Sequence, residues 1–147
     1  MNITLRNDEK VYIRAFEEKD FLEINELNKK EGWNNLVTKH EDTKRAWMNS
    51  NVAFVAIENE LIIGYCRGLT DGSISLYICE LLIDESFRGK GLGQKITYWI
   101  HSMYPNTRME LLASSTSHSF YESQQYRPFY GFRKTFEEYD VNMKKEC

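Results

Sequence analysis

The sequence Arg88-Gly89-Lys90-Gly91-Leu92-Gly93 determines how the rest of the chain is interpreted. It follows an apolar run at residues 78–83 and precedes a helical pattern that begins near Gln94. Glycine permits unusual backbone conformations and lets an anionic ligand approach the main chain closely. The helix behind the loop offers free N–H groups and a positive dipole end. A strand, a glycine-rich loop and a helix in this order predict a phosphate-binding site.

The glycine spacing excludes two common phosphate-binding loops. The P-loop of nucleoside triphosphatases reads G-x-x-x-x-G-K-[ST], and no glycine of this chain precedes a lysine and a hydroxyl residue in that way. The dinucleotide-binding pattern is G-x-G-x-x-G within a βαβ unit, whereas this loop reads G-x-G-x-G without a surrounding βαβ repeat. Neither of these nucleotide-binding classes is therefore expected.

The loop resembles the acyl-CoA loop of the GNAT family of N-acetyltransferases, whose motif is [Q/R]-x-x-G-x-[G/A]. Its three defined positions are occupied by Arg88, Gly91 and Gly93. The resemblance implies acetyl-CoA as co-substrate, with its pyrophosphate bound by backbone N–H groups and by the two cations. It assigns to cofactor binding Arg88, Gly89, Lys90, Gly91, Leu92 and Gly93. Alternatively, the two cationic side chains are solvated surface groups, and the loop is a plain glycine-rich turn.

Composition and charge narrow the class of protein. The 147 residues carry 19 Lys and Arg against 22 Asp and Glu, which argues against a nucleic-acid partner. No window approaches eighteen uncharged apolar residues, so no membrane partner is expected. The three cysteines lack metal-ligand spacing and are interpreted as reduced thiols. We expect one N-acetyltransferase domain over residues 1–147, cytoplasmic and without a metal ion.

The first part of the chain predicts a strand and two helices. Alternation over residues 11–16 indicates the strand, and the acidic residues 17–20 then open a helix. A capping box at residues 38–41 predicts a second helix that ends near Asn49. In the family that the loop resembles, the region between these helices closes over the acceptor substrate. Trp33 in that region could stack on the substrate or pack at the lip of the site.

The order of the remaining elements predicts a mixed α/β fold. Asp71-Gly72 is a hairpin signal between strands, and a helix from Gln94 to Tyr104 connects the fourth strand to the fifth, which should be parallel. The resemblance implies the GNAT fold, a mostly antiparallel sheet of about seven strands with about four helices, in which strands four and five splay apart. The strands expected after the first are residues 52–58, 61–70, 73–84, 109–113 and about 139–144, with a further one before the last.

The resemblance also assigns backbone groups to the pantetheine arm of CoA. In the family this arm inserts between the splayed strands and pairs with the fourth strand. By position these groups belong to Leu81 and Ile83, with Leu82 between them. A splayed strand leaves an N–H free to polarise the thioester carbonyl, and the resemblance places that N–H at about Leu81.

A second signature follows the fifth strand. The family motif F-Y-E-x-x-G-[F/Y] is similar to Phe120-Tyr121-Glu122 followed by Tyr126, although Gln125 replaces the glycine. The resemblance implies that Tyr121 donates a proton to the departing thiolate. Alternatively, the Tyr121 ring packs on the crossover helix. His118 is a second candidate for the acid, although a lone histidine in a serine-rich loop is usually a polar loop residue.

Glu80 is the candidate general base. It is the only carboxylate within the apolar run at residues 78–83. A carboxylate at that place either activates or anchors an amine, or it is an outward-facing strand residue, since alternation gives it a polar face.

These observations predict an acyltransferase that moves the acetyl group of acetyl-CoA to a primary amine of a small molecule. The amine would attack directly in a ternary complex, because no cysteine lies in either signature. The alternatives are an acetyltransferase acting on a protein amine and a non-catalytic acyl-CoA-binding sensor. Dense aromatic residues late in the chain are compatible with a homodimer: Phe129, Tyr130, Phe132 and Phe136.

Overall fold

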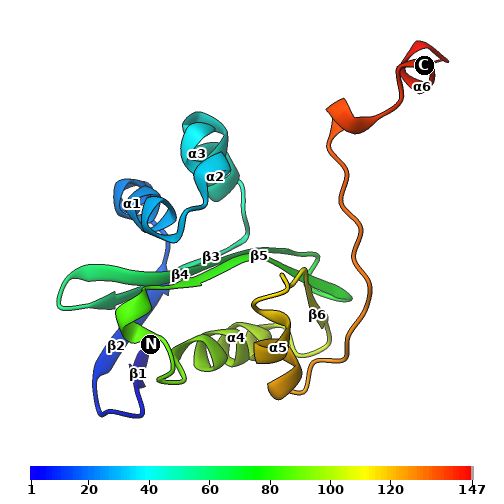
Figure 1. Ribbon diagram of the computed structural model, residues 1–147. Coiled ribbons are helices and arrows are strands. Elements are labelled where there is room, and N and C mark those ends of the chain that lie inside the picture. Colours follow the sequence, from blue (N-terminus) through cyan, green and yellow to red (C-terminus); the bar gives the residue numbers. More distant parts are fainter. Residues whose placement is uncertain (147) are drawn as a thin grey trace. The chain divides into compact units, whose positions relative to one another are not determined.

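Apolar alternation in the first 111 residues builds one six-stranded sheet, in the order β1-β2-β3-β4-β5-β6 (Figure 1). The computed structural model describes residues 1–146. Contacts divide the chain into two units, Met1–Leu111, which holds the sheet, and the residues from Leu112 onward. The strands are β1 Asn2–Thr4, β2 Lys10–Ala15, β3 Val52–Glu58, β4 Leu61–Thr70, β5 Ser75–Ile83 and β6 Arg108–Leu111.

Strand pairing confirms the predicted mixed sheet. Strands β1 to β5 pair antiparallel in chain order, whereas β5 and β6 pair parallel, with Ser75 opposite Arg108. A parallel pair needs a crossover connection, and helix α4 Leu92–Met103 supplies it. The strand count differs slightly from the predicted number of about seven. Residues 1–146 hold six strands: β1 is additional to the prediction, and the two strands predicted after β6 are absent within that range.

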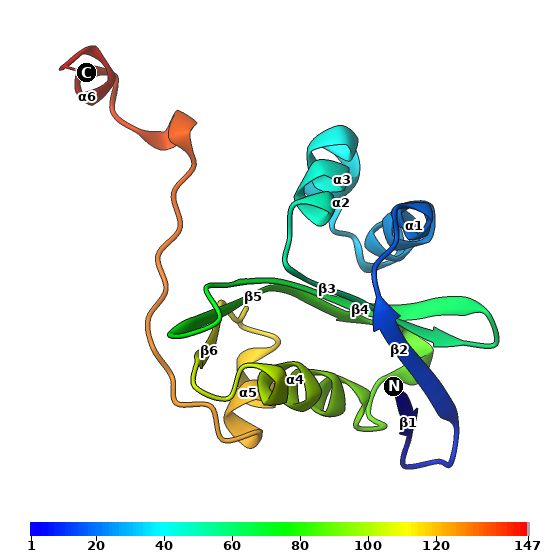
Figure 2. The same cartoon turned by 180° about the vertical axis from the view of Figure 1, so that it is seen from behind.

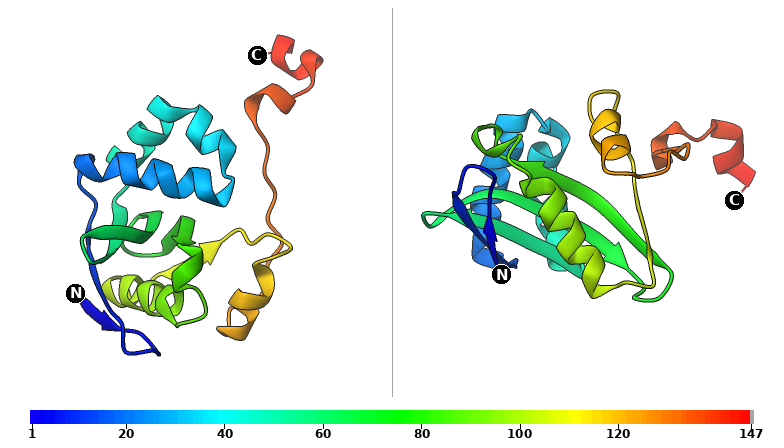
Figure 3. Two further views of the ribbon diagram at one scale, coloured as in Figure 1. Left: turned by 60° about the vertical axis from the view of Figure 1, so that its left-hand side comes forward. Right: turned by 90° about the horizontal axis from the view of Figure 1, so that it is seen from below.

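Helices cover both faces of the sheet, and each face has its own hydrophobic core. Helices α1 Phe21–Glu31, α2 Asn34–Thr38 and α3 His40–Met48 lie on one face, and α4 lies on the other (Figure 1, Figure 2). Helix α4 crosses the strands obliquely (Figure 3). The core on the α4 side includes Val11, Ile13, Leu76, Ile78, Leu92, Ile96 and Ile100. The core on the opposite side includes Phe21, Ile24, Leu27, Trp47, Val55, Tyr65 and Leu82.

A β-bulge interrupts the pairing of β4 with β5. Arg67 lies opposite Glu80, whereas the next residue of β4, Gly68, lies opposite Ile78, so Cys79 is the extra residue. The backbones approach closely here, since a Cβ on Gly68 would lie 2.6 Å from the Tyr77 carbonyl oxygen. The extra residue reverses the alternation of β5, because side chains of a strand point to opposite faces in turn.

The helices differ from the prediction in number and in their starting residues. The described residues contain six α-helices rather than about four, and α2 was not predicted. Thr38 ends α2, so it does not cap α3, which begins at His40 without a side-chain cap. Helix α4 begins at Leu92, two residues before the predicted Gln94. No helix in the described part of the chain is both long enough and apolar enough to span a bilayer.

The second unit contains two short helices, α5 His118–Ser123 and α6 Val141–Glu146. The strand predicted at about residues 139–144 is wrong, because α6 covers most of that range. The aromatic residues expected in late strands are exposed, Phe129 at 84%, Tyr130 at 97% and Phe132 at 95%. A strand needs a partner edge as well as apolar alternation, and alternation alone is what the sequence offers here.

Asp71 organises the turn between β4 and β5, which spans residues 71–74 rather than two residues. Its Oδ1 accepts the backbone N–H groups of Ser73, Ile74 and Ser75 at 2.8–3.0 Å. These hydrogen bonds hold the pKa of Asp71 at about 2, below its ordinary value of 3.8.

Asp71→Asn should flatten the dependence of folding stability on pH in the acid range. The pKa of Asp71 is lowered in the folded chain, so its charge stabilises the fold above about pH 4. That contribution is lost as the pH falls from about 4 to about 2. Urea unfolding at a series of pH values measures the effect, with the exposed Asp42→Asn as control. An unchanged slope in the Asp71 variant would contradict this role.

Candidate functional site

The edge of β5 beyond Ile78 forms the first part of the candidate site. Strand β6 ends opposite Ile78, so no described strand pairs with that side of residues 79–83. Asp84 donates its backbone N–H to β4 at 2.7 Å, and successive residues of a strand direct their amide groups to opposite sides. Leu81 and Ile83 therefore direct their backbone groups away from β4, toward the open edge.

Leu82 lies differently from its two neighbours. Its side chain is buried at 3% exposure in the core beneath α1 and α3, and it pairs with Tyr65 on β4. Leu81 and Ile83 pack instead against the core on the α4 side. Of the three residues assigned to the cofactor by resemblance, the structure thus brings the backbones of Leu81 and Ile83 to the open edge and directs that of Leu82 toward β4.

The glycine loop and the start of α4 form the second part. Gly89 and Gly91 have φ of 76° and 87°, a region that favours glycine, and Gly91 is the N-cap of α4. Lys95 donates the first hydrogen bond of the helix, to the Gly91 carbonyl at 3.1 Å. The N–H groups of residues 92–94 precede it and have no acceptor within the helix. Leu92 contributes its backbone here, because its side chain is buried.

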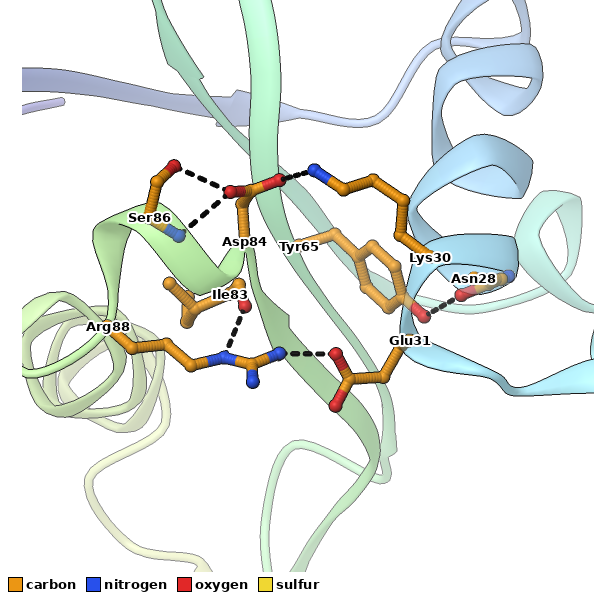
Figure 4. A network of polar contacts seen from close by, with 8 residues as sticks. All are labelled: Asn28, Lys30, Glu31, Tyr65, Ile83, Asp84, Ser86 and Arg88. Atoms are coloured by element: carbon orange, nitrogen blue, oxygen red, sulfur yellow. Dashed lines mark hydrogen bonds and ion pairs between the residues drawn. The ribbon is translucent and has the colours of Figure 1, made fainter.

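Arg88 begins the loop, and its side chain reaches Ile83 and Glu31 (Figure 4). Its Nε donates to the Ile83 carbonyl at 2.8 Å, which is one of the groups at that edge. Its Nη2 forms an ion pair with Glu31, the last residue of α1. Arg88 is therefore not a freely solvated cation in this structure, although its side chain is 45% exposed.

Two more cations surround the loop. Lys90 Nζ lies 3.0 Å from Glu9 Oε1, and it also lies 5.0 Å from the centre of the Phe87 ring. The hydrogen bond from Lys90 lowers the pKa of Glu9. Arg6 donates its backbone N–H to the Lys90 carbonyl, and its guanidinium lies against Gly91, where a Cβ would meet Nε at 3.4 Å. Together with the helix N-terminus, these groups make the loop electropositive.

Ion pairs attach the end of α1 to the end of β5. Besides the Glu31 contact, Lys30 Nζ lies 2.7 Å from Asp84 Oδ2 (Figure 4). Asp84 also accepts the N–H and hydroxyl of Ser86. The Lys30 contact and the Ser86 bonds hold the pKa of Asp84 at about 2. Nearby, the hydroxyl of buried Tyr65 donates to Asn28 Oδ1, and burial raises the pKa of that tyrosine.

Glu80 forms an ion pair inside the fold. Its carboxylate oxygens lie 2.9 and 2.7 Å from Arg67 Nη2, and both side chains are mostly buried, at 13% and 15% exposure. Arg67 also donates to Ser50 Oγ at 3.1 Å. Burial opposes the charge of Arg67, but the hydrogen bond to Glu80 and the attraction of the nearby negative charge together outweigh it and raise the pKa of the guanidinium. Glu80 is thus not an outward-facing strand residue, and a cation already engages it.

The other predicted site residues are distant from the loop in sequence: Trp33 precedes it, and His118 and Tyr121 follow it. Trp33 is partly buried at the start of α2, where it packs against the core beneath α1 and α3. Tyr121 belongs to α5 in the second unit, and its ring centre lies 5.1 Å from that of Phe120 and 5.4 Å from that of Tyr126. His118 Nδ1 lies 3.5 Å from Glu122 in the same helix. Substrate stacking by Trp33 and proton donation by Tyr121 stay predictions.

Sequence reasoning missed three charged residues that surround the loop: Arg6, Glu9 and Glu31. Each is distant from the loop in sequence, and only the fold brings them to it. The only local signal for the two carboxylates was the positive charge of the loop. The loop has no acidic residue of its own, so carboxylates that pair with its cations must come from elsewhere in the chain. Within residues 1–146, no group of three or more His, Cys, Asp or Glu side chains is arranged to hold a metal ion.

A family model described as an acetyltransferase (GNAT) domain matches residues 49–128, more than half of the chain. These residues include β5, the glycine loop, α4 and α5. No curated protein sequence matches the chain.

Solved structures share the fold at low sequence identity. A GNAT family acetyltransferase from Streptococcus pneumoniae gives a TM-score of 0.72 at 18% identity, over 87% of this chain and 99% of the other. An aminoglycoside acetyltransferase from an uncultured soil metagenomic sample, in complex with sisomicin, gives 0.61 at 16%, over 86% and 96%. An aminoglycoside N-acetyltransferase in complex with CoA gives 0.64 at 15%, over 84% and 94%. These similarities show the fold alone.

Arg67→Met should lower the free energy of unfolding by roughly 3 kcal/mol, because it leaves the Glu80 carboxylate buried without its cation. The double variant Arg67→Met/Glu80→Met should recover most of this loss, since apolar side chains can replace a buried ion pair. Urea unfolding compares the variants. If the double variant is no more stable than the single one, an unpaired carboxylate is not the cause of the loss.

Proposed function

The chain belongs to the GNAT acetyltransferase family, and we propose that it transfers the acetyl group of acetyl-CoA to a primary amine of a small molecule. The observation that carries this is the position of the α4 N-terminus in the loop that follows the open edge of β5. Such a combination offers donors for phosphate and backbone groups for the amide-containing arm of CoA in one continuous stretch of chain.

The residues present suit acyl-CoA. The N–H groups of residues 92–94 and the charges of Arg6, Arg88 and Lys90 would hold the diphosphate through charge-assisted hydrogen bonds. The backbone groups of Leu81 and Ile83 would pair with the amides of the pantetheine arm. Gly91 suits close approach, because its φ of 87° favours glycine and a residue without a side chain leaves its backbone open to a ligand.

Transfer also requires a neutral amine. A lysine-like amine has a pKa of about 10.4, so its deprotonation at pH 7 costs roughly 4–5 kcal/mol. Glu80 is proposed to anchor the amine or accept its proton, directly or through water. Since Arg67 engages Glu80, the carboxylate is held in a fixed orientation. The amine nitrogen would then attack the thioester carbon, with the Leu81 N–H polarising the carbonyl.

The carbon–sulfur bond breaks as the new amide forms, and the thiolate takes a proton from an acid. Tyr121 is proposed as that acid on the basis of its motif. Tyr121 lies in α5 of the second unit. Substitution of this residue tests the proposed role directly.

A small-molecule acceptor is proposed because aminoglycoside acetyltransferases share the fold. A non-catalytic acyl-CoA-binding module is the second candidate function, and a specific observation favours it. Glu80 is already paired with Arg67, as a carboxylate that only stabilises the fold would be. An acetyltransferase acting on a protein amine is the remaining alternative.

The decisive experiment measures free-thiol release from acetyl-CoA with polyamines, aminoglycosides, amino acids and arylalkylamines as acceptors. Release with one chemical class would support the enzyme and identify its substrate class. Thermal stabilisation by CoA without release for any acceptor would favour a protein acceptor or the non-catalytic module. No stabilisation by CoA would contradict the proposed ligand.

Gly91→Glu should abolish CoA binding, because it places a side chain and a negative charge where the diphosphate would approach the backbone. A residue other than glycine at positive φ also costs about 1 kcal/mol of stability. Gly72→Glu is the matched control, since Gly72 has a φ of 78° in the β4–β5 turn with open space around it. Calorimetry with CoA should show binding by the control alone. CoA affinity of the wild-type value in folded Gly91→Glu would contradict the loop assignment.

Tyr121→Phe should lower turnover by about 10²-fold or more while leaving acetyl-CoA binding nearly unchanged, because only the proton donor is removed. Tyr130→Phe is the control in the same unit, since Tyr130 is 97% exposed. Steady-state kinetics with the best acceptor from the panel separates the two. Equal turnover in both variants would leave Tyr121 with a packing role only.

A further inference from the structure

The Arg88 side chain makes two contacts inside the protein, and acyl-CoA binding at the proposed site would affect both. Its Nε donates to the Ile83 carbonyl, which lies at the open edge of β5. Its Nη2 is paired with the Glu31 carboxylate (Figure 4). A ligand arm that pairs with Ile83 and a diphosphate that takes the Arg88 charge would therefore each compete with a contact made inside the protein.

Glu31 and a diphosphate are antagonists for electrostatic reasons. Both are anions, and both would be placed on one guanidinium group that lies partly in solvent, at 45% exposure. Two anions at hydrogen-bond distance of the same cation repel each other. Lys30 does not have this conflict, because it is not proposed to bind the diphosphate. Its ion pair with Asp84, the residue after β5, can therefore keep α1 attached to the strand.

We propose that Glu31 and the diphosphate of acyl-CoA compete for Arg88, so that filling the cofactor site frees the carboxylate at the end of α1. The free carboxylate then lies immediately before Gly32 and Trp33, the segment proposed to contact the acceptor. Linkage makes this effect reciprocal. If acyl-CoA strengthens the binding of a ligand to the freed Glu31 by some factor, that ligand strengthens acyl-CoA binding by the same factor. A cationic amine acceptor has the charge to do this, which makes Glu31 a positioning residue that couples the two substrates.

Isothermal titration with CoA tests the competition directly. Glu31→Gln should bind CoA roughly two- to fivefold more tightly than the wild type, the range expected for loss of one partly exposed ion pair. Glu85→Gln removes one negative charge from the short helix Glu85–Phe87 beside the loop, and it should change the affinity less. The tighter binding should diminish at high salt, which screens exposed charges.

A double-mutant cycle shows whether Glu31 acts through Arg88. Arg88→Gln should weaken CoA binding, and Glu31→Gln should have no further effect in that background. Thermal melts confirm that each variant is folded. Weaker or unchanged CoA binding by Glu31→Gln, or an equal gain in the Arg88→Gln background, would overturn the competition.

Hydrogen exchange supplies a readout that simple charge removal does not move. The N–H groups of Gly32 and Trp33 close the end of α1, bonded to Lys29 and Asn28 at 3.1 and 2.9 Å. CoA should accelerate their exchange in the wild type and not in Glu31→Gln, where no ion pair is broken. Slower exchange in the presence of CoA would overturn the proposed release.

The competition rests on the proposed function, because acyl-CoA binding at this loop is itself a proposal. The titrations distinguish the failure of one proposal from the failure of the other. A wild type that does not bind CoA overturns both. A wild type that binds CoA, with Glu31→Gln equal to it, overturns only the competition and leaves the acetyltransferase proposal standing.

Discussion

The β-bulge at Cys79 is the constraint on which the candidate site depends. Without it, the alternation of the first half of β5 would continue, and Glu80 would face α4 while Leu81 faced α1. The bulge instead directs Leu81 and Ile83 to the open edge and places Glu80 opposite Arg67. One additional residue thus settles which backbone groups are available to a ligand and which carboxylate lies inside the fold.

Charge balance at the glycine loop depends on carboxylates from distant parts of the chain. A helix N-terminus surrounded by three cations is unfavourable, and two of the three cations are paired with Glu9 and Glu31. These carboxylates come from the β1–β2 turn and from α1. An anion that took the charge of Arg88 or Lys90 would weaken these same pairs, so stability and anion affinity would be opposed at this loop.

Local sequence patterns predicted the parts of the fold that depend on short-range order. The antiparallel meander, the parallel crossover and the strand–loop–helix around Gly91 follow from periodicity and from glycine chemistry. The bulge left a trace in the spacing of Leu76, Ile78, Leu81 and Ile83, which slips by one position, but a run whose only charged residue is Glu80 hides such a slip.

The remainder depended on tertiary contacts. The Glu31–Arg88 and Arg67–Glu80 pairs join residues that are separated in sequence, and apart from the apolar neighbours of Glu80 nothing local distinguishes these charges from solvated ones. The predicted late strand failed for a related reason, since strand formation needs a partner edge that the sequence does not specify. Charged groups that complete a site are therefore harder to predict than the glycines that shape it.

The two hydrophobic cores on opposite faces of the sheet have a consequence for how such a chain can diverge. Residues of one core do not pack into the other, so substitutions on the two sides should contribute nearly additively to stability. The face covered by α1, α2 and α3 can change its amino acids while the face covered by α4 keeps its own. Selection for a new partner molecule can therefore act on one side of the sheet at little cost to the other.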